Sequence, residues 1–279
     1  NAQVWDSTYS LSADTLFYFS KIDSGSANGN AILKQDNQTI SGQKIEYKEF
    51  PDSKGVSYAA RGSVMILEQE RLATCGEAVY DRKNGKTTLR INPEITDNGQ
   101  VITGSEIFLK YKEDVLQNIF IPKDARAIRP TNGTREWFEV VDGDTSNFTD
   151  SASFVDDMTG STLRGFFVDG SLDSLRLEGM ATTIYHLFED SVYQGRNLVS
   201  GDTISMKFDN QDLDHIFVNG GSRGTYIPDS TNGEVDGPVT YSSEDIEYDI
   251  LNEFMNLHGE ADIKYTNVNL TAGFINMEW

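Results

Sequence analysis

A repeated unit near each end of the chain limits the possible folds more than any other feature of the sequence. The first copy spans residues 29–47, the second spans residues 259–277, and the two align without a gap. Both read Gly-x-Ala-x-apolar-Lys-x-x-Asn-x-x-apolar-x-small-x-x-Ile. Self-similarity of this kind indicates a fold in which one structural unit recurs and neighbouring copies bury a shared core.

The first half of the unit is a strand pattern, Gly-x-Ala/Val-x-apolar, that recurs along the chain. Apolar residues stand at every second position, which is typical of a strand with one buried face. The leading glycine suits a turn or a sharp start to the strand. The copies begin at Gly29, Gly62, Gly76, Gly179 and Gly259.

The second half is a different pattern, apolar-x-small-x-x-apolar-x-apolar. Its apolar positions are two residues apart on both sides, but the step from Gly42 to Ile45 is three residues. A regular strand would turn one half of this pattern to the wrong face, so we expect a β-bulge or corner that absorbs one residue. The copies begin at Leu11, Ile40, Ile102, Val199, Tyr241 and Leu270, with a shorter one at Leu163.

Successive strands that bend at the same place make a sheet that is folded along its length. The sequence therefore predicts an all-β chain of short antiparallel strands, with very little helix and one continuous apolar interior. Turn-forming pairs fall between the apolar runs, as such a fold requires. These pairs are Asp36-Asn37, Asn84-Gly85, Asn98-Gly99 and Asn232-Gly233.

Two segments interrupt the repeats. Residues 130–160 are acidic and lack the strand patterns, so they form either a linker or a pair of strands with long acidic loops. We expect one β-unit at 1–129, the irregular insertion at 130–160, and a second β-unit at 161–279 that is either separate from the first or continuous with it. Residues 220–238 are rich in Gly, Ser, Asp and Asn, which predicts an exposed loop.

The charge of the chain limits its partners. The formal net charge is -21 and the isoelectric point is about 4.4, which argues against nucleic acid and against adsorption to anionic lipid. An anionic ligand would need bridging divalent cations or one local basic patch. The single Cys75 excludes an internal disulfide, and we expect it to be a small buried apolar residue.

The alternation of the two patterns resembles the OstA-like family, which comprises the periplasmic lipopolysaccharide-transport protein LptA and the N-terminal periplasmic domain of LptD. The resemblance covers roughly residues 10–128 and 160–279, and it depends on the number and order of the motifs. It implies an elongated antiparallel β-jellyroll, open like a folded sheet, whose apolar interior holds lipid A acyl chains. Such units stack end to end into a bridge across the periplasm. The length of this chain and its acidic interruption depart from the LptA pattern and favour a longer member with two tandem units.

The inward apolar row has two interpretations that the residues leave open. It is either the packed core of a narrow β-sandwich or the lining of a groove in which acyl chains replace a missing second layer. The resemblance favours the groove. The groove candidates are Ile40, Ile45, Tyr47, Val64, Ile66, Ile102, Ile107, Leu109, Val199, Ile204, Met206, Ile216, Val218, Ile246, Tyr248, Ile263 and Ile275. The candidates for contact with lipid A phosphates are Lys34, Lys44, Lys207 and Lys264.

No arrangement of catalytic or metal-ligating residues can be recognised in the sequence. His186, His215 and His258 stand far apart and lack metal-ligand spacing. Nucleophile elbows, P-loops and dinucleotide fingerprints are absent, and carboxylate pairs are expected by chance among 44 acidic residues. Residues 209–214 resemble a calcium loop but lack its central glycine and distal glutamate. We therefore expect a protein that is not an enzyme and has neither a cofactor nor a metal site.

The resemblance leads us to expect a carrier or bridge for lipopolysaccharide in the periplasm, with association with the outer membrane as a further expectation. Its partners would be the lipid A part of lipopolysaccharide and other OstA-like proteins, or further copies of itself paired end to end by β-augmentation. The alternatives are a structural or adhesive β-repeat protein with a packed interior, and an extracellular carbohydrate-binding module or hydrolase. Residues 270–279 stop inside a strand pattern, which fits a free edge or a longer protein with a following membrane barrel equally well.

Overall fold

The structure, a computed structural model, describes most of the chain. The described residues are 2–5, 7–35, 37–49, 56–141, 144–209, 212–229 and 237–278. All regular elements in these ranges are β-strands, and the ranges contain no helix. The predicted all-β fold is therefore confirmed. The chain divides into unit 1, made of residues 1–125 and 162–172, and unit 2, made of residues 126–161 and 173–279.

Unit 1 is a set of antiparallel strands in which the long ones pair with their neighbours in sequence. β4 pairs with β2, β3 and β5, and the pairing continues through β6 to β7. β7 pairs with both β8 and β9, and β8 leads through β11 and β12 to β15. The strands are β1 (Ala2–Trp5), β2 (Tyr9–Ala13), β3 (Thr15–Phe19), β4 (Ser24–Gln35), β5 (Gln38–Glu49), β6 (Val56–Glu68), β7 (Arg71–Asp81), β8 (Lys86–Arg90), β9 (Glu94–Asp97), β10 (Gln100–Thr103), β11 (Glu106–Lys112), β12 (Val115–Ile121) and β15 (Thr162–Val168).

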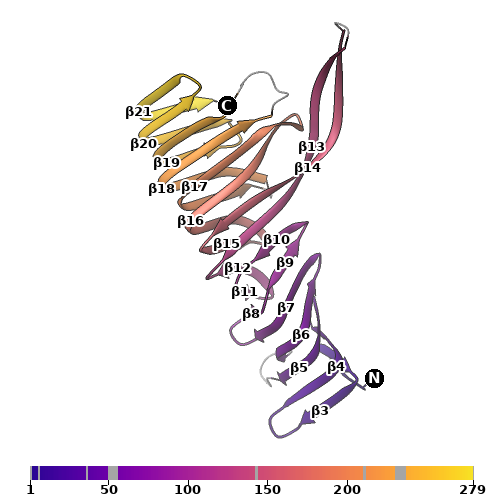
Figure 1. The fold of residues 1–279 in the computed structure, drawn as a ribbon. Coiled ribbons are helices and arrows are strands. Elements are labelled where there is room, and N and C mark those ends of the chain that lie inside the picture. The colour runs from indigo at the N-terminus through magenta and orange to yellow at the C-terminus, as the bar shows by residue number, and fades with distance from the viewer. Residues whose placement is uncertain are drawn as a thin grey trace. The chain divides into compact units, whose positions relative to one another are not determined.

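Unit 2 contains longer strands, and each one from β16 to β21 pairs antiparallel with the next (Figure 1). Two further strands, β13 and β14, precede them in the chain. The strands are β13 (Ala125–Val141), β14 (Asp144–Gly160), β16 (Ser171–Glu189), β17 (Val192–Asp209), β18 (Asp212–Pro228), β19 (Val239–Asp249), β20 (Phe254–Tyr265) and β21 (Val268–Glu278).

The long strands bend at corners, where the pairing register shifts. The register of β4 with β5 shifts between Asn28 and Ala31, and Gly29 and Asn30 between them have φ angles of 76° and 46°. Two residues of β4 therefore oppose one residue of β5, which is a β-bulge in left-handed conformation. The other Gly-Xaa pairs with positive φ at both residues are Gly62-Ser63, Gly179-Met180, Gly220-Gly221 and Gly259-Glu260.

The bend stands where the sequence predicts it, but the extra residue lies in the other strand of the pair. The step of three from Gly42 to Ile45 lies opposite the bulge, and the bulge belongs to the Gly-x-Ala strand. The leading glycine of that pattern is therefore in the middle of a strand, contrary to the prediction of a turn or strand start. The spacing of apolar residues along one strand cannot show on which of two paired strands the extra residue lies.

A polar side chain of the neighbouring strand covers the glycine of a corner. A Cβ atom at Gly259 would collide with the carboxylate of Glu244, and one at Gly29 would collide with Asp14. The backbone N–H of Asp14 donates to the Gly29 carbonyl (2.9 Å), and Asn30 Nδ2 donates to Asp14 Oδ2 (3.0 Å). The corner glycine is thus favoured by its conformation, and a Cβ atom there would also displace the polar side chain that covers it.

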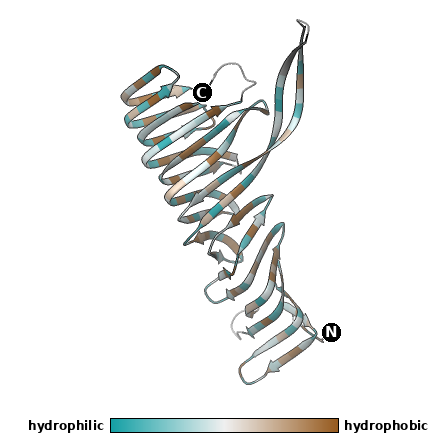
Figure 2. Ribbon diagram, in the orientation of Figure 1, coloured by the Kyte–Doolittle hydropathy of each residue, from teal (hydrophilic) through white to brown (hydrophobic). Residues whose placement is uncertain are grey.

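The corners divide each unit into two half-sheets that face each other, and hydropathy alternates along their strands (Figure 2). In unit 1, half-sheet 1 contains β3, β8, β11, β12, β15 and residues 24–28, 44–49, 56–61 and 77–81, and half-sheet 2 contains β1, β2, β9, β10 and residues 31–35, 38–41, 64–68 and 71–75. In unit 2, half-sheet 1 contains residues 173–178, 203–209, 212–219, 245–249, 254–258 and 274–278, and half-sheet 2 contains residues 181–189, 192–200, 222–228, 239–242, 261–265 and 268–272.

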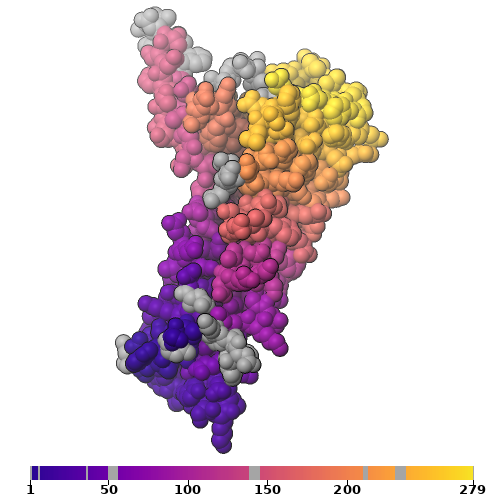
Figure 3. Space-filling model, turned by 180° about the vertical axis from the view of Figure 1, so that it is seen from behind, coloured from indigo at the N-terminus to yellow at the C-terminus, as the bar shows by residue number. Residues whose placement is uncertain are grey.

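The described part of the acidic segment at 130–160 lies in two long strands, β13 and β14, which agrees with the second of the two alternatives, a pair of strands. The two strands lie side by side and extend beyond the neighbouring strands of unit 2 (Figures 1 and 3). The ring of Trp137 stacks on Phe148 at 5.7 Å, and Ser153 Oγ donates to Asn132 Oδ1 (2.9 Å). Residues 145–150 are exposed on both faces. A strand without a buried face has no alternating apolar pattern, which is why the sequence does not reveal these strands.

The predicted loop at 220–238 is wrong for its first part. β18 continues to Pro228 and pairs with β19 along its length, with Gly220-Gly221 as its corner. The glycines that suggested a loop are therefore a bend inside a strand. Residues 230–236 lie outside the described residues.

The turn predictions have mixed outcomes. Asn84-Gly85 and Asn98-Gly99 lie in turns, as predicted. Asp36 and the pair Asn232-Gly233 lie outside the described residues.

Candidate functional site

The predicted groove residues lie in the interior between the half-sheets, in two sets. Unit 1 brings together Ile40, Ile45, Tyr47, Val64, Ile66, Ile107 and Leu109, and unit 2 brings together Val199, Ile204, Met206, Ile216, Val218, Ile246, Tyr248, Ile263 and Ile275. All of these side chains are buried. Ile102 on β10 is only half-buried. The apolar spacing in the sequence thus identifies residues of the interior. That the interior serves as a lipid groove stays a prediction.

A row of tyrosines, of which only Tyr47 was predicted, lines the interior of unit 1. Tyr58 pairs with Tyr47 on one side and with Tyr80 on the other. The rings of Tyr58 and Tyr80 are 5.4 Å apart, and Tyr9 faces Tyr47 from the opposite half-sheet at 6.1 Å. Tyr47, Tyr58 and Tyr80 stand at matching distances from the corner along their strands. That recurrence is the sequence signal that could have identified them.

Hydrogen bonds cross the seam of unit 1, which we define as the edge where its half-sheets meet opposite the corners. They run from Tyr9 Oη to Glu49 Oε1 (2.5 Å), from the Val56 backbone N–H to Gln35 Oε1 (2.6 Å), and from Tyr111 Oη to Glu68 Oε2 (3.2 Å). The Arg71 guanidinium also lies over the Phe167 ring at 5.8 Å. Polar side chains thus close this edge over an apolar interior.

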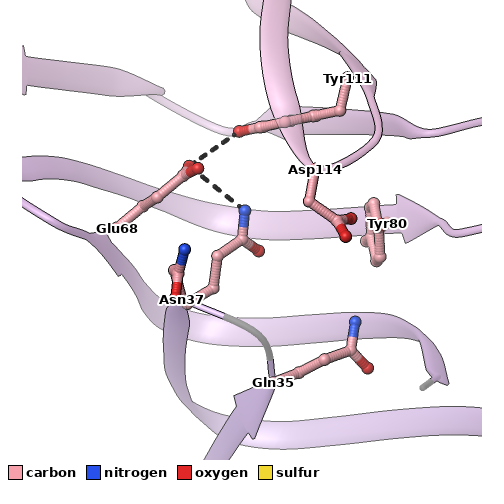
Figure 4. Close-up of a pocket in the computed structure, with 7 residues that line it drawn as sticks. Gln35, Asn37, Glu68, Tyr80, Tyr111 and Asp114 are labelled. Carbon is pink, nitrogen blue, oxygen red and sulfur yellow. Dashed lines mark hydrogen bonds between the residues drawn. The ribbon is translucent and has the colours of Figure 1, made fainter. Parts of the chain in front are cut away.

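Two small cavities lie at this seam. One has a volume of about 20 Å³ and is lined by Gln35, Asn37, Gln38, Glu68, Tyr80, Tyr111 and Asp114 (Figure 4). The other has a volume of about 10 Å³ and is lined by Gln38, Tyr58, Ile66, Glu68, Arg71, Ala73, Thr87, Leu109 and Tyr111. Cavities of this size hold about one water molecule and are too small for an acyl chain. At these two cavities, the half-sheets must move apart before an acyl chain can lie between them.

Two hydroxyl groups at the smaller cavity have no hydrogen-bond partner. They are Tyr58 Oη and Thr87 Oγ1, on side chains that are 3% and 2% exposed. Burial raises the pKa of Tyr58 well above its usual range, and burial also raises the pKa of Tyr111. Both phenols therefore stay protonated and can donate a hydrogen bond.

In unit 2, a network of Tyr185, Asn197, Tyr241 and Tyr248 occupies the interior. Asn197 Nδ2 donates to Tyr185 Oη (2.9 Å), and Tyr241 Oη donates to Asn197 Oδ1 (2.5 Å). The hydroxyls of Tyr241 and Tyr248 are 2.8 Å apart. Tyr248 belongs to half-sheet 1 and the other three to half-sheet 2, so this buried network joins the two half-sheets. Burial raises the pKa of its three tyrosines, which keeps them neutral.

The lysines considered for phosphate contacts lie on outward positions of their strands. Lys44 Nζ is 2.7 Å from Glu46 Oε1, and Lys264 Nζ is 3.2 Å from Asp262 Oδ1. Lys34 and Lys207 are exposed. The structure therefore does not bring the four together at the interior.

The histidines occupy three different strands of unit 2. The Nδ1 atom of His186 is 3.0 Å from Asp156 Oδ1, and that of His215 is 2.9 Å from Asp214 Oδ2, whereas His258 is exposed. Among the described residues, no group of three or more His, Cys, Asp or Glu side chains could hold a metal ion. The run 209–214 includes residues 210 and 211, which lie outside the described residues.

Apolar side chains are exposed on the strands at one edge of each unit. β3 pairs with β4, and β21 pairs with β20. The exposed apolar residues are Phe17, Tyr18 and Phe19 on β3, and Val268, Leu270 and Phe274 on β21, whose outer surface is yellow in Figure 3. An edge strand of this kind can accept a further strand.

The fold and its interior define a class: all-β chains in which a bent antiparallel sheet encloses an apolar interior. Residues 10–115, which lie in unit 1, match the family model described as the LptA/(LptD N-terminal domain) LPS transport protein. The match confirms the resemblance seen in the repeats for residues 10–115.

The chain was also compared with solved structures and with curated protein sequences. A crystal structure of LptH, the LptA homologous periplasmic component of the lipopolysaccharide transport device of Pseudomonas aeruginosa, is similar at 14% identity and a TM-score of 0.35. The match covers 39% of this chain and 79% of that one. A search of curated protein sequences finds no match. Among the described residues, none forms a helix of the length and apolarity needed to cross a membrane.

Proposed function

We propose that the protein is a component of lipopolysaccharide transport in the periplasm, which binds lipopolysaccharide and shields its acyl chains between the half-sheets. One observation carries the proposal: an apolar interior, closed along its seam by polar side chains, lies in the part of the chain that matches the model of a lipopolysaccharide transport family. The saccharide, which is hydrophilic, stays in solvent. Association with the outer membrane is part of the same proposal.

The balance of free energies favours replacing contacts between the half-sheets by contacts with acyl chains. Each buried methylene contributes about 0.8 kcal/mol, so ten would contribute about 8 kcal/mol. Each hydrogen bond that crosses the seam contributes only about 0.5–1.5 kcal/mol net. Because the chain that enters covers the apolar side chains again, separation of the half-sheets loses little burial. The seam is therefore the route by which we expect acyl chains to enter.

The exposed apolar edges support a bridge built from several units. β3 and β21 can each pair with a strand of another transport protein or of a second copy of this chain. Such pairing would also cover Phe17, Phe19 and Leu270, which are exposed in the single chain.

Binding of lipopolysaccharide and of its parts tests the acyl-chain claim. A fluorescently labelled lipopolysaccharide is titrated with the protein, with isolated lipid A and the deacylated saccharide as competitors. We expect lipid A to displace the label and the deacylated saccharide to have no effect. Equal competition by the saccharide would refute an acyl-chain site.

A structural β-repeat protein with a permanently packed interior is the second candidate. The size of the cavities favours it, because neither exceeds about 20 Å³. This candidate predicts no saturable binding in the same titration.

A further inference from the structure

The two units differ in how they satisfy hydroxyl groups in their interiors. In unit 2, the network of Tyr185, Asn197, Tyr241 and Tyr248 supplies partners to its own members. In unit 1, Tyr58 Oη and Thr87 Oγ1 are buried without a partner. A buried hydroxyl without a partner destabilises the fold, so its retention points to a partner that arrives with solvent or with a ligand.

The two residues with unpartnered hydroxyls, Tyr58 and Thr87, both line the smaller cavity at the seam. Its wall also contains the apolar side chains of Ile66, Ala73 and Leu109 and the polar ones of Gln38, Glu68, Arg71 and Tyr111. Thr131 and Thr183 of unit 2 also have unpartnered hydroxyls, but they line neither cavity. Two hydroxyl donors among apolar side chains suit an apolar chain that carries an oxygen atom.

The charges at this part of the seam disfavour an anionic group. Glu68 lines both cavities, and Asp114 lines the larger one (Figure 4). Arg71, which also lines the smaller cavity, is paired with Asp97 at 2.9 Å. A phosphate would meet net negative charge here, so the oxygen that binds Tyr58 and Thr87 is uncharged, as in an ester, an amide or a hydroxyl group.

The contact that closes the seam of unit 1 beside the two cavities is only partly buried. The bond from Tyr111 to Glu68 is 3.2 Å long and only partly buried. The contact that joins the half-sheets of unit 2, between Tyr241 and Tyr248, is 2.8 Å and buried within a network. A partly buried bond exchanges more easily with water than a buried one.

On the basis of the proposed function, we propose that unit 1 is the unit that takes the acyl chain. The chain enters through the seam beside Glu68 and Tyr111, and Tyr58 and Thr87 donate hydrogen bonds to an uncharged oxygen of that chain. The network of unit 2 keeps its half-sheets together.

Conservative variants of the whole chain separate a ligand role from a structural role. Tyr58→Phe and Thr87→Val remove hydroxyls that have no partner in the protein, whereas Tyr241→Phe removes one that does. For Tyr58→Phe and Thr87→Val we expect about fivefold weaker binding of fluorescent lipopolysaccharide and no decrease in unfolding temperature. For Tyr241→Phe we expect a lower unfolding temperature and unchanged affinity.

Several results would overturn the proposal. Wild-type affinity in both unit 1 variants means that the hydroxyls bind solvent only. A decrease in unfolding temperature for Tyr58→Phe as large as that for Tyr241→Phe means that its hydroxyl has a structural partner. Absence of binding by the wild-type chain refutes the proposed function and this inference with it.

Photo-crosslinking locates the acyl chain independently of folding stability. A benzophenone amino acid replaces Gln38, which lines both cavities of unit 1, or Gln194 near the end of β17 in unit 2. We expect lipopolysaccharide adducts from position 38 and few from position 194. Adducts from position 194 alone would place the acyl chain in unit 2, which overturns the inference and leaves the proposed function intact.

Discussion

Single residues at the corners determine where each strand bends. Gly259 has a φ of 74°, and the Glu244 side chain occupies the space that a Cβ atom would need. Its neighbour Glu260 also has positive φ, at 46°, which costs a non-glycine residue energy. The bend is thus encoded by a glycine and a polar side chain on adjacent strands.

Replacement of a corner glycine should destabilise the fold. Gly259→Ala forces alanine into the left-handed region against Glu244, and we expect it to lower the free energy of unfolding by about 1–3 kcal/mol. Gly273→Ala is the matched control, because no atom lies within 4 Å of its Cβ position. Urea unfolding measures both. Equal effects of the two substitutions would refute the role assigned to the corner.

Some residues of the site could be predicted from the sequence, and others could not. The apolar positions Ile45 and Ile204 follow a period of two, and both are fully buried. Tyr58 and Thr87 could not be assigned, because the hydrogen-bond partner of a buried hydroxyl depends on the opposite half-sheet. The seam contact of Tyr111 with Glu68 joins residues far apart in sequence, and no local pattern specifies it.

Asp156 is one of two buried carboxylates that connect the hairpin of β13 and β14 to the rest of unit 2, the other being Asp229, which pairs with Arg135. Asp156 has 2% side-chain exposure and accepts hydrogen bonds from Arg129 Nη2 (2.7 Å) and from the backbone N–H of His186 (2.9 Å). The Phe154 ring stacks on Tyr193 at 4.3 Å beside this carboxylate. The sequence shows the acidic pair that contains Asp156 but not its buried partners.

Removal of this carboxylate should loosen the hairpin. Asp156→Ala leaves Arg129 and the His186 backbone without their acceptor, and we expect a loss of about 3–5 kcal/mol. Hydrogen exchange should increase in residues 145–160. Asp150→Ala, at an exposed position of the same hairpin, should change neither quantity. An Asp156→Ala protein with wild-type exchange would contradict the attachment.

An ion-pair ladder crosses the outer face of unit 1, and one of its members gives a pH prediction. Arg61 lies between Glu46 (2.5 Å) and Glu77 (2.8 Å), and Arg90 continues the ladder from Glu77 to Glu106. Hydrogen bonds from Lys44 and then Arg61 lower the pKa of Glu46 below its ordinary value of 4.5.

The sign of the pH effect follows from this lowered pKa. The contribution of Glu46 to stability is complete above the unfolded-state pKa and is lost as the pH falls through the lower folded-state pKa. We therefore expect Glu46→Gln to make the free energy of unfolding decrease less steeply below pH 4.5. Glu260→Gln, at an exposed corner, is the control. An unchanged acid slope in Glu46→Gln, measured by urea unfolding at several pH values, would refute the prediction.

Each of the two units has an exposed apolar edge strand that suits pairing with a further strand. We expect the mean mass from light scattering to rise with concentration, and Leu270→Asp on β21 to reduce that rise because a charge on an edge strand opposes pairing. Met180→Asp, at a corner residue that is 83% exposed, should have no effect. A strictly monomeric wild-type chain would count against self-association, though not against a different partner.

The fold class was predictable from the repeats, whereas the exact bounds of the two units were not. The alternation and the step of three define a bent strand wherever one face is buried. The two patterns are missing from β13 and β14, where residues 145–150 are exposed on both faces, and the boundaries of the units depend on contacts between strands remote in sequence.

The central claim is that acyl chains of lipopolysaccharide lie between the half-sheets. The most direct measurement is photo-crosslinking to lipopolysaccharide from a benzophenone amino acid at Ile45, which is fully buried, compared with the adjacent outward position Glu46. If acyl chains lie there, we expect adducts from position 45 and few from position 46. Equal labelling at the two positions would contradict it.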